Sequence, residues 1–158
     1  MLPLLLALAL AVPPDPDEDE EPAAPEPARW TLSATGGAAI PVGSAGGATA
    51  PFAGAEIAFD LGFADVGLLA QAYRLGTEGA PPWSPVLLAR LEERFETLRG
   101  AEAFLAFGIG AGRPRAWTVW YQLSLGVALR EGPLSLGLEV GFEQQDLLRL
   151  AGSIGWRF

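Results

Sequence analysis

Residues 29–158 alternate between apolar and small or polar side chains along most of their length, and this alternation limits the possible folds more than any other feature. A period of two is that of a β-strand, whose successive side chains point to opposite faces of a sheet, whereas a helix repeats every 3.6 residues. The longest clear run spans residues 117–130 and places these apolar residues on one face: Trp117, Val119, Tyr121, Leu123, Leu125, Val127 and Leu129. The chain is therefore predicted to be an all-β protein.

Seven stretches show this alternation, and turn-forming residues separate several of them. The stretches are residues 29–42, 53–61, 66–73, 102–110, 117–130, 134–143 and 148–158. Residues 62–65 (Gly-Phe-Ala-Asp) and 130–133 (Arg-Glu-Gly-Pro) have the composition of tight turns. Strands joined in sequence order by tight turns predict an antiparallel sheet.

The first 28 residues differ in character from the rest. Residues 2–11 are apolar and end in Ala9-Leu10-Ala11, so residues 1–11 are read as a secretory signal peptide, although the usual positive charge at its start is missing. Residues 13–28 are rich in proline and hold seven acidic residues, no base and no aromatic or β-branched side chain. Such a segment buries too little apolar surface to offset its ordering entropy. We therefore expect a disordered linker over residues 12–28 and one folded domain over residues 29–158.

Three absent residue types narrow the possible chemistry. The chain has no His, Cys or Lys, so all ten of its basic side chains are Arg. Without Cys there is no disulfide, no thiolate nucleophile and no cysteine metal site. Without His the usual general base and the commonest metal ligand are missing. Outside the linker, twelve acids and ten Arg leave a charge of only −2, and no basic stripe suggests nucleic acid. We expect no cofactor.

Two features of the sheet favour a membrane over water. The non-apolar face carries Gly, Ala and Ser with isolated Glu, Gln and Arg, whereas the exposed face of a soluble protein is rich in charged residues. Aromatic residues lie at strand ends, as in the two aromatic girdles of membrane barrels. The first predicted girdle comprises Trp30, Phe59, Phe63, Phe95, Trp156 and Phe158, and the second comprises Phe52, Tyr73, Trp83, Trp117 and Phe142.

The last predicted strand carries a further signal. Phe158 has Trp156, Ile154, Gly152 and Leu150 in phase behind it. In this the sequence resembles bacterial outer-membrane barrel proteins, and overall it resembles the small eight-stranded barrels of the OmpA and OmpX type. The resemblance implies a closed antiparallel up-and-down transmembrane β-barrel of about eight strands, in a Gram-negative envelope. It also implies that the barrel-assembly machinery reads Phe158, Trp156 and Ile154 as an assembly signal.

One segment, residues 85–98, fits two structures. A helix is suggested by an apolar stripe, with Ser84 as N-cap, Pro85 at the first position and Gly100 at the C-terminal end. A strand is suggested by alternation that only Glu93 interrupts. We predict a strand, because bacterial barrels have an even number of strands and seven others are already assigned.

An eight-stranded barrel with a periplasmic N-terminus has a definite orientation. Strand one crosses outward and strand eight returns, so the linker and both termini lie on the periplasmic side. Turns at 62–65, 96–100 and 130–133 then face the periplasm, and loops at 43–51, 75–84, 112–116 and 144–147 face outward. Arg74, Arg113 and Arg115 fall near the outer rim, where they suit phosphates of lipopolysaccharide, although ordinary solvation explains them equally well. The expected surroundings are outer-membrane lipid and lipopolysaccharide, and the expected oligomeric state is a monomer.

The candidate site is the inward face of the barrel. Its charged residues are Glu56, Asp60, Arg90, Glu92, Arg94, Glu102, Arg130, Glu139, Glu143, Arg149 and Arg157. They form either a polar path for small ions or an ion-pair network that holds the barrel together. The second reading is preferred because eight strands leave an interior that side chains alone fill. Glu143 and Arg149 flank the last hairpin on one face and are the best candidate pair.

Three functions follow from this reading. The first is a structural barrel of the envelope without catalysis, and the second is a narrow channel for ions or small solutes. The third is a soluble periplasmic or secreted barrel that binds an apolar ligand, with its apolar face inward. Barrel enzymes of the outer membrane usually use a His beside a Ser or Asp, so the absence of His argues against an enzyme. The direction in which Leu123, Leu125 and Val127 point separates the membrane class from the soluble class.

Overall fold

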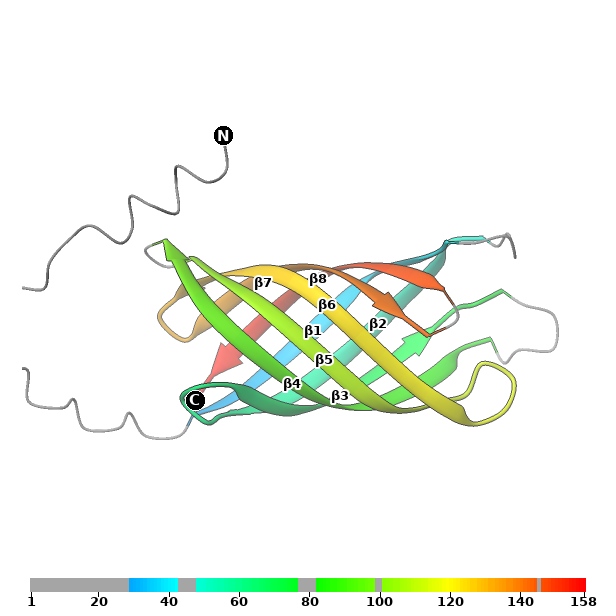
Figure 1. The fold of residues 1–158 in the computed structure, drawn as a ribbon, viewed down its shortest axis with the longest axis horizontal. Helices are drawn as coiled ribbons and strands as arrows, with labels where there is room; N and C mark the ends of the chain where they lie inside the picture. The colour runs from blue at the N-terminus through cyan, green and yellow to red at the C-terminus, as the bar shows by residue number, and fades with distance from the viewer. Residues whose placement is uncertain (1–28, 43–47, 77–81, 99–100, 145) are drawn as a thin grey trace, which may run out of the picture.

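A computed structural model describes residues 29–42, 48–76, 82–98, 101–144 and 146–158, without the side chains of residues 96–98. Its eight strands form one closed antiparallel barrel in sequence order (Figure 1). The strands are β1 (Trp30–Pro41), β2 (Ala50–Asp60), β3 (Asp65–Tyr73), β4 (Ser84–Leu98), β5 (Ala101–Gly112), β6 (Thr118–Glu131), β7 (Leu134–Glu143) and β8 (Leu147–Arg157). The predicted all-β barrel of eight strands is confirmed. The predicted signal peptide and linker lie outside the described residues.

The first and last strands close the barrel. β1 pairs with β8 from Thr31 opposite Arg157 to Pro41 opposite Leu147. Beyond that ladder, Trp30 N donates to Phe158 O at 3.0 Å and Phe158 N donates to Trp30 O at 2.9 Å. Each strand therefore has a neighbour on both sides, and the sheet has no open edge. In hydrocarbon this matters because no water is present to satisfy a free backbone donor or acceptor.

The segment with two possible structures is a strand. β4 pairs with β3 along nine residues, from Asp65 opposite Glu92 to Tyr73 opposite Ser84, and with β5 on its other side. The local helix signals are overridden because a helix here would leave the edges of β3 and β5 unpaired. No helix in the described part of the chain is long and apolar enough to cross a membrane.

The apolar face of the sheet points away from the barrel axis. Leu123, Leu125 and Val127 are 50%, 60% and 53% exposed, whereas the adjacent Gln122 and Ser124 are 1% and 2% exposed. A soluble barrel has the opposite arrangement, with apolar side chains packed in a dry centre. The outward direction predicted for these side chains is confirmed, and the soluble barrel with an inward apolar face is excluded.

The barrel has two different ends. The end that holds Trp30 and Phe158, here named the turn end, also holds the β2–β3 and β6–β7 turns and the point where β4 ends and β5 begins (Figure 1). At the opposite end, here named the loop end, β1, β3, β5 and β7 finish and β2, β4, β6 and β8 begin. The order in which strands meet at the two ends is the one expected from the sequence, but the expected bounds differ. Residues 96–98 of the expected 96–100 turn belong to β4, and residues 50 and 51 of the expected 43–51 loop belong to β2.

The aromatic residues follow the predicted girdles with two exceptions. Around the turn end, Phe59 is half-buried and the other members of the first girdle are exposed: Trp30, Phe63, Phe95, Trp156 and Phe158. Trp83, Trp117 and Phe142 are exposed toward the loop end. Phe52 and Tyr73 were expected in the second girdle, and this prediction is wrong because both side chains are buried inside the barrel. The reason is strand phase: the outward positions beside them are taken by Ala53 and Ala72, so the two rings point inward.

Candidate functional site

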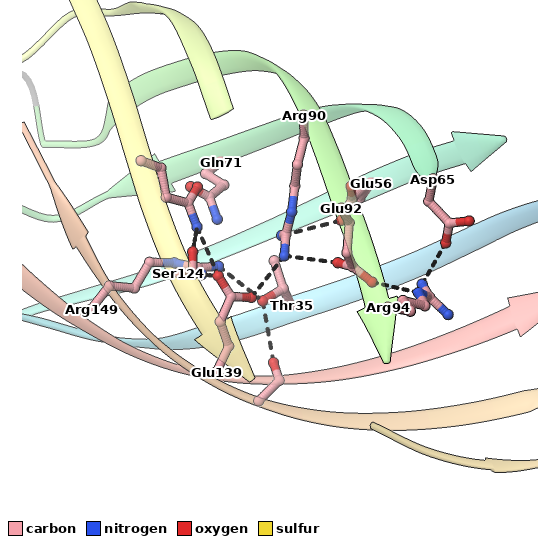
Figure 2. Close-up of polar contacts among 12 residues, drawn as sticks. Thr35, Glu56, Asp65, Gln71, Arg90, Glu92, Arg94, Ser124, Glu139 and Arg149 are labelled. Carbon is pink, nitrogen blue, oxygen red and sulfur yellow. Dashed lines mark hydrogen bonds and ion pairs between the residues drawn. The ribbon is translucent and has the colours of Figure 1, made fainter. Parts of the chain in front are cut away.

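The lumen contains a chain of eight charged side chains of alternating sign, here named the charge ladder. Its members, from the loop end toward the turn end, are Glu143, Arg149, Glu139, Arg90, Glu92, Arg94, Glu102 and Arg130. They project inward because they occupy the alternate positions of β4 to β8 that face the axis. Each member forms an ion pair with the next, so the ladder connects five of the eight strands. Figure 2 shows its central part.

Arg90 on β4 is the centre of the ladder and is only 5% exposed. Its Nη2 atom lies 3.0 Å from Glu92 Oε2 and 3.2 Å from Glu139 Oε2 on β7. Its Nη1 atom lies 3.4 Å from Glu56 Oε2 on β2 (Figure 2). One guanidinium group thus joins three strands across the lumen, which is the geometry that a planar five-donor group provides.

Glu139 is the acceptor where several donors converge. It accepts from Arg90, from Arg149 on β8 and, at 2.8 Å, from Gln122 Nε2 on β6. Gln122 also donates to Ser124 Oγ at 3.0 Å. A buried carboxylate with this many donors is compensated for the loss of water around it.

The turn-end part of the ladder is built around Arg94. Its Nε atom lies 2.7 Å from Glu92 Oε1, its Nη1 3.4 Å from Glu102 Oε2 and its Nη2 2.6 Å from Asp65 Oδ2. Glu102 also pairs with Arg130 Nε on β6 at 3.1 Å. Asp65 was not among the predicted lumen charges, since the sequence placed it in a turn. The structure places it at the first position of β3, opposite Glu92.

The loop-end part of the ladder is fully buried. Arg149 is 0% exposed and pairs with Glu139, while its Nε atom lies 3.5 Å from Glu143 Oε1. Glu143 and Arg149 were the best candidate pair from sequence, and the structure brings them together on β7 and β8. Arg149 Nη2 also lies 3.4 Å from Thr35 Oγ1 on β1.

The structure places each of the eleven predicted lumen charges in an ion pair. Nine belong to the ladder or its branch at Glu56. The other two, Asp60 on β2 and Arg157 on β8, form a separate pair at the turn end that joins strands on either side of β1. With Asp65 added, the side chains that the structure describes place seven carboxylates and five guanidinium groups in the lumen.

Sequence reasoning missed a second inward group, here named the aromatic layer, which comprises Phe52, Tyr73 and Trp120. The Phe52 and Tyr73 rings are stacked with centroids 5.1 Å apart, and those of Tyr73 and Trp120 are 5.8 Å apart. All three are buried, and Leu69 and Leu88 belong to the same apolar cluster. These residues come from the loop-end parts of β2, β3, β4 and β6, so the layer fills the lumen at that end.

The aromatic layer and the charge ladder touch each other. The Arg149 guanidinium carbon lies 4.7 Å from the centroid of the Phe52 ring, at the distance of a cation–π contact. The Tyr73 hydroxyl lies 2.6 Å from Glu143 Oε1 and 2.8 Å from Gln71 Oε1. Glu143 therefore receives both a hydroxyl from the aromatic layer and a guanidinium group from the ladder.

Two inward glycines make room for large rings. A Cβ atom at Gly112 would lie 2.5 Å from Cε3 of Trp120, and one at Gly126 would lie 2.1 Å from Cζ of Phe104. Both distances are too short for a real contact, so each ring occupies space that a side chain at the glycine would need. Small residues on the inward face are thus what allows aromatic rings to fill a barrel of only eight strands.

The ladder encloses a small cavity toward the turn end. Its volume is about 50 Å³, and it is lined by ladder charges and by hydroxyl groups such as those of Ser33, Ser135 and Ser153. This is enough space for a few water molecules, and the lining offers them several polar partners. Among the described residues, no group of three or more acidic side chains is arranged to hold a metal ion.

Comparison with known proteins gives a likeness in structure without a likeness in sequence. The sequence matches no protein-family model, and a search of curated proteins finds no match. A crystal structure of Neisserial surface protein A (NspA) superposes with a TM-score of 0.65 at 12% identity, covering 83% of this chain and 97% of that one. A structure from the de novo design of transmembrane β-barrels gives a TM-score of 0.54 at 14% identity, covering 83% and 95%. The chain therefore has the fold of the small transmembrane β-barrels, with eight strands.

Proposed function

We propose that this protein is a barrel of the bacterial outer membrane with a closed lumen, and that it acts as a structural component of the envelope. The observation that carries the proposal is the filled interior. The aromatic layer fills the loop end together with Glu143 and Arg149 of the charge ladder, and the rest of the ladder crosses the lumen toward the turn end. An open pore needs inward side chains that leave a continuous aqueous path, as in barrels of 16 or more strands.

The outward surface supports placement in a membrane. Exposed apolar side chains cover all sides of the barrel, and exposed aromatic residues lie near both ends. Such a surface is unstable in water but is solvated by acyl chains, with aromatic rings at the level of the headgroups. In the proposed orientation the turn end faces the periplasm and the loop end faces outward.

The proposed route to the membrane uses both ends of the sequence. Residues 1–11 would direct export. Ile154, Trp156 and Phe158 are exposed on the outward face of β8 at the turn end, where the assembly machinery would read them. We expect Phe158→Ala to lower the amount in the outer membrane, while the purified variant still refolds in detergent. Normal outer-membrane levels of this variant would refute the assembly signal.

Two measurements on the wild-type protein test the proposal. The protein should remain in the membrane fraction until detergent is added, and it should migrate on a gel differently before and after heating. In a planar bilayer it should give a flat current trace at high protein load. Steady single-channel currents would contradict the closed lumen and would favour the alternative function, a narrow channel for ions or small solutes.

The structural role is tested in cells. A strain without the gene should become sensitive to detergents that an intact outer membrane excludes, and the wild-type gene should restore resistance. A variant that folds but carries a disrupted charge ladder should restore resistance only partly, since its barrel is less stable. Unchanged detergent resistance in the deletion strain would refute an envelope role.

A further inference from the structure

The loop end carries a group of exposed basic and aromatic side chains, here named the basic rim. It comprises Arg74, Trp83, Arg113, Arg115 and Trp117. Arg74 directly follows β3, Trp83 precedes β4, Arg113 and Arg115 follow β5, and Trp117 precedes β6. Because β3 to β6 are consecutive neighbours in the barrel, all five residues lie on one arc of its circumference.

The three arginines of the basic rim differ from those of the lumen. The side chains of Arg74, Arg113 and Arg115 are exposed, and within the described residues none of them has an ion pair or a side-chain hydrogen bond. Their backbones are fixed, because Arg74 N donates to Pro51 O at 3.0 Å and Arg113 N donates to Pro85 O at 2.9 Å. The basic rim thus presents exposed guanidinium groups without ion pairs, and backbone hydrogen bonds hold Arg74 and Arg113 in place.

The rest of the loop end has a different charge. On the arc of β7, β8, β1 and β2, the described connecting residues carry Asp146 and no basic side chain. The outward charges near the turn end include the acidic Glu93 and Glu131. Arg29 lies at the turn end but is not without a partner, so among the described residues the exposed arginines without an ion pair are concentrated on one side of the loop end.

The side chains of the basic rim are suited to a phosphorylated lipid headgroup. Guanidinium groups bind phosphate oxygens in pairs of parallel hydrogen bonds, and Trp prefers the level of lipid headgroups. Arg74 and Arg113 follow strands that are two apart in the sheet, a separation of about 10 Å at the usual strand spacing. That separation suits two phosphates on one headgroup better than a single phosphate.

We propose that the basic rim binds a lipid headgroup bearing two phosphate groups, that of the lipid A part of lipopolysaccharide. This inference rests on the proposed function, because it needs the loop end to face the outer leaflet. The two exposed indoles would lie beside the sugar and upper acyl region while the three arginines hold the phosphates. The occupant is a membrane lipid, so free phosphate is not expected to compete.

The test uses the full chain without its first 11 residues, folded in a zwitterionic detergent, and native mass spectrometry with added lipid. We expect one diphosphorylated lipid A to bind per barrel, and monophosphorylated lipid A to bind several-fold more weakly. Arg74→Gln/Arg113→Gln/Arg115→Gln should lose at least about tenfold in affinity, since charge-assisted hydrogen bonds are lost. The matched control Glu93→Gln/Glu131→Gln, at the turn end, should bind like the wild type.

Several outcomes would overturn the proposal. They are wild-type affinity of the triple variant, an equal loss in the turn-end control, equal binding of lipid A without phosphates, and displacement by millimolar inorganic phosphate. Arg74→Lys/Arg113→Lys/Arg115→Lys separates geometry from charge, because wild-type affinity there would refute paired guanidinium contacts. Heat-dependent gel migration of each variant checks that the barrel is intact. A wild-type protein that does not enter membranes contradicts the proposed function and not the lipid A site. Fractionation shows that failure, whereas gel migration shows whether a variant is folded.

Discussion

The two halves of the lumen have the same wall and are filled in opposite ways. At the loop end, packed aromatic rings fill the lumen, and Trp120 occupies the space beside Gly112. Toward the turn end, ion pairs enclose a cavity of about 50 Å³ that is lined by charges and hydroxyls. The difference separates two tasks. Close-packed rings exclude water and ions, whereas the ion pairs connect opposite strands and tolerate some water.

The contact between the two halves gives the largest predicted effect. Arg149→Met removes a cation that touches both Glu139 and Glu143 and also faces the Phe52 ring. We expect the free energy of unfolding to fall by about 3–5 kcal/mol, the usual result of leaving buried charges without a partner. Urea titration in detergent micelles, followed by tryptophan fluorescence, measures it. Adding Glu143→Gln should restore part of the loss, and a loss below about 1 kcal/mol, typical of exposed pairs, would show that the pair is unimportant.

Removing rings from each half in turn tests whether the aromatic layer alone seals the lumen. Tyr73→Ala/Trp120→Ala should lower the free energy of unfolding by about 3 kcal/mol or more, and it should also give measurable ion currents in a planar bilayer. The matched control is Phe104→Ala, which removes a buried ring from the charged half. We expect this control to lose stability without conducting. Equal currents from both variants would mean that the seal is not located in the aromatic layer.

Filling the space beside the rings should cost less. Gly112→Ala and Gly126→Ala each place a methyl group against a ring, and overpacking of this kind costs about 1–3 kcal/mol. Gly152→Ala is the control, because its Cβ atom would point outward with no heavy atom nearer than 3.9 Å. Urea titration should rank the control as neutral. Destabilisation by Gly152→Ala equal to that of the inward pair would contradict the steric explanation.

The smallest predicted effect concerns the Tyr73 hydroxyl, where the aromatic layer contacts the charge ladder. Tyr73→Phe keeps the stacked ring but removes the hydroxyl that lies 2.6 Å from Glu143. The free energy of unfolding should fall by about 1–2 kcal/mol, since a buried charged acceptor loses one donor. The bilayer current should stay flat because the ring still fills the lumen. Currents from Tyr73→Phe would transfer the sealing role from the ring to its hydrogen bond.

The sequence allowed the wall of this barrel to be predicted, because alternation is a local property. It predicted which residues of β6 face outward and which charges face inward, and it predicted β4 as a strand once an even strand count was required. It also paired Glu143 with Arg149, which adjoin the same hairpin. These features depend on neighbours in sequence or on one shared face.

The contents of the lumen were harder to predict, because they depend on how the strands are staggered around the barrel. Arg90 meets Glu139 from a strand that is not its neighbour, and alternation contains no information on such pairs. Asp65 was missed because a residue between two strands looks like part of a turn. Tyr73 was placed in a girdle from its position near a strand end, although its phase with Leu69 and Gln71 already favoured an inward ring.

The pairing of β1 with β8 has a consequence for how this molecule is made. Thr35 donates to the carbonyl of Gly152, 117 residues further along the chain. The first strand therefore cannot find this partner until the chain has been synthesised at least as far as β8. Until then the sheet has two unpaired edges and an exposed apolar face. Both favour association with another unfinished copy of the chain, which leads to aggregation. Closure of the barrel thus depends on β8, the last of the eight strands to be made, and the sheet keeps both edges exposed until that strand pairs with β1.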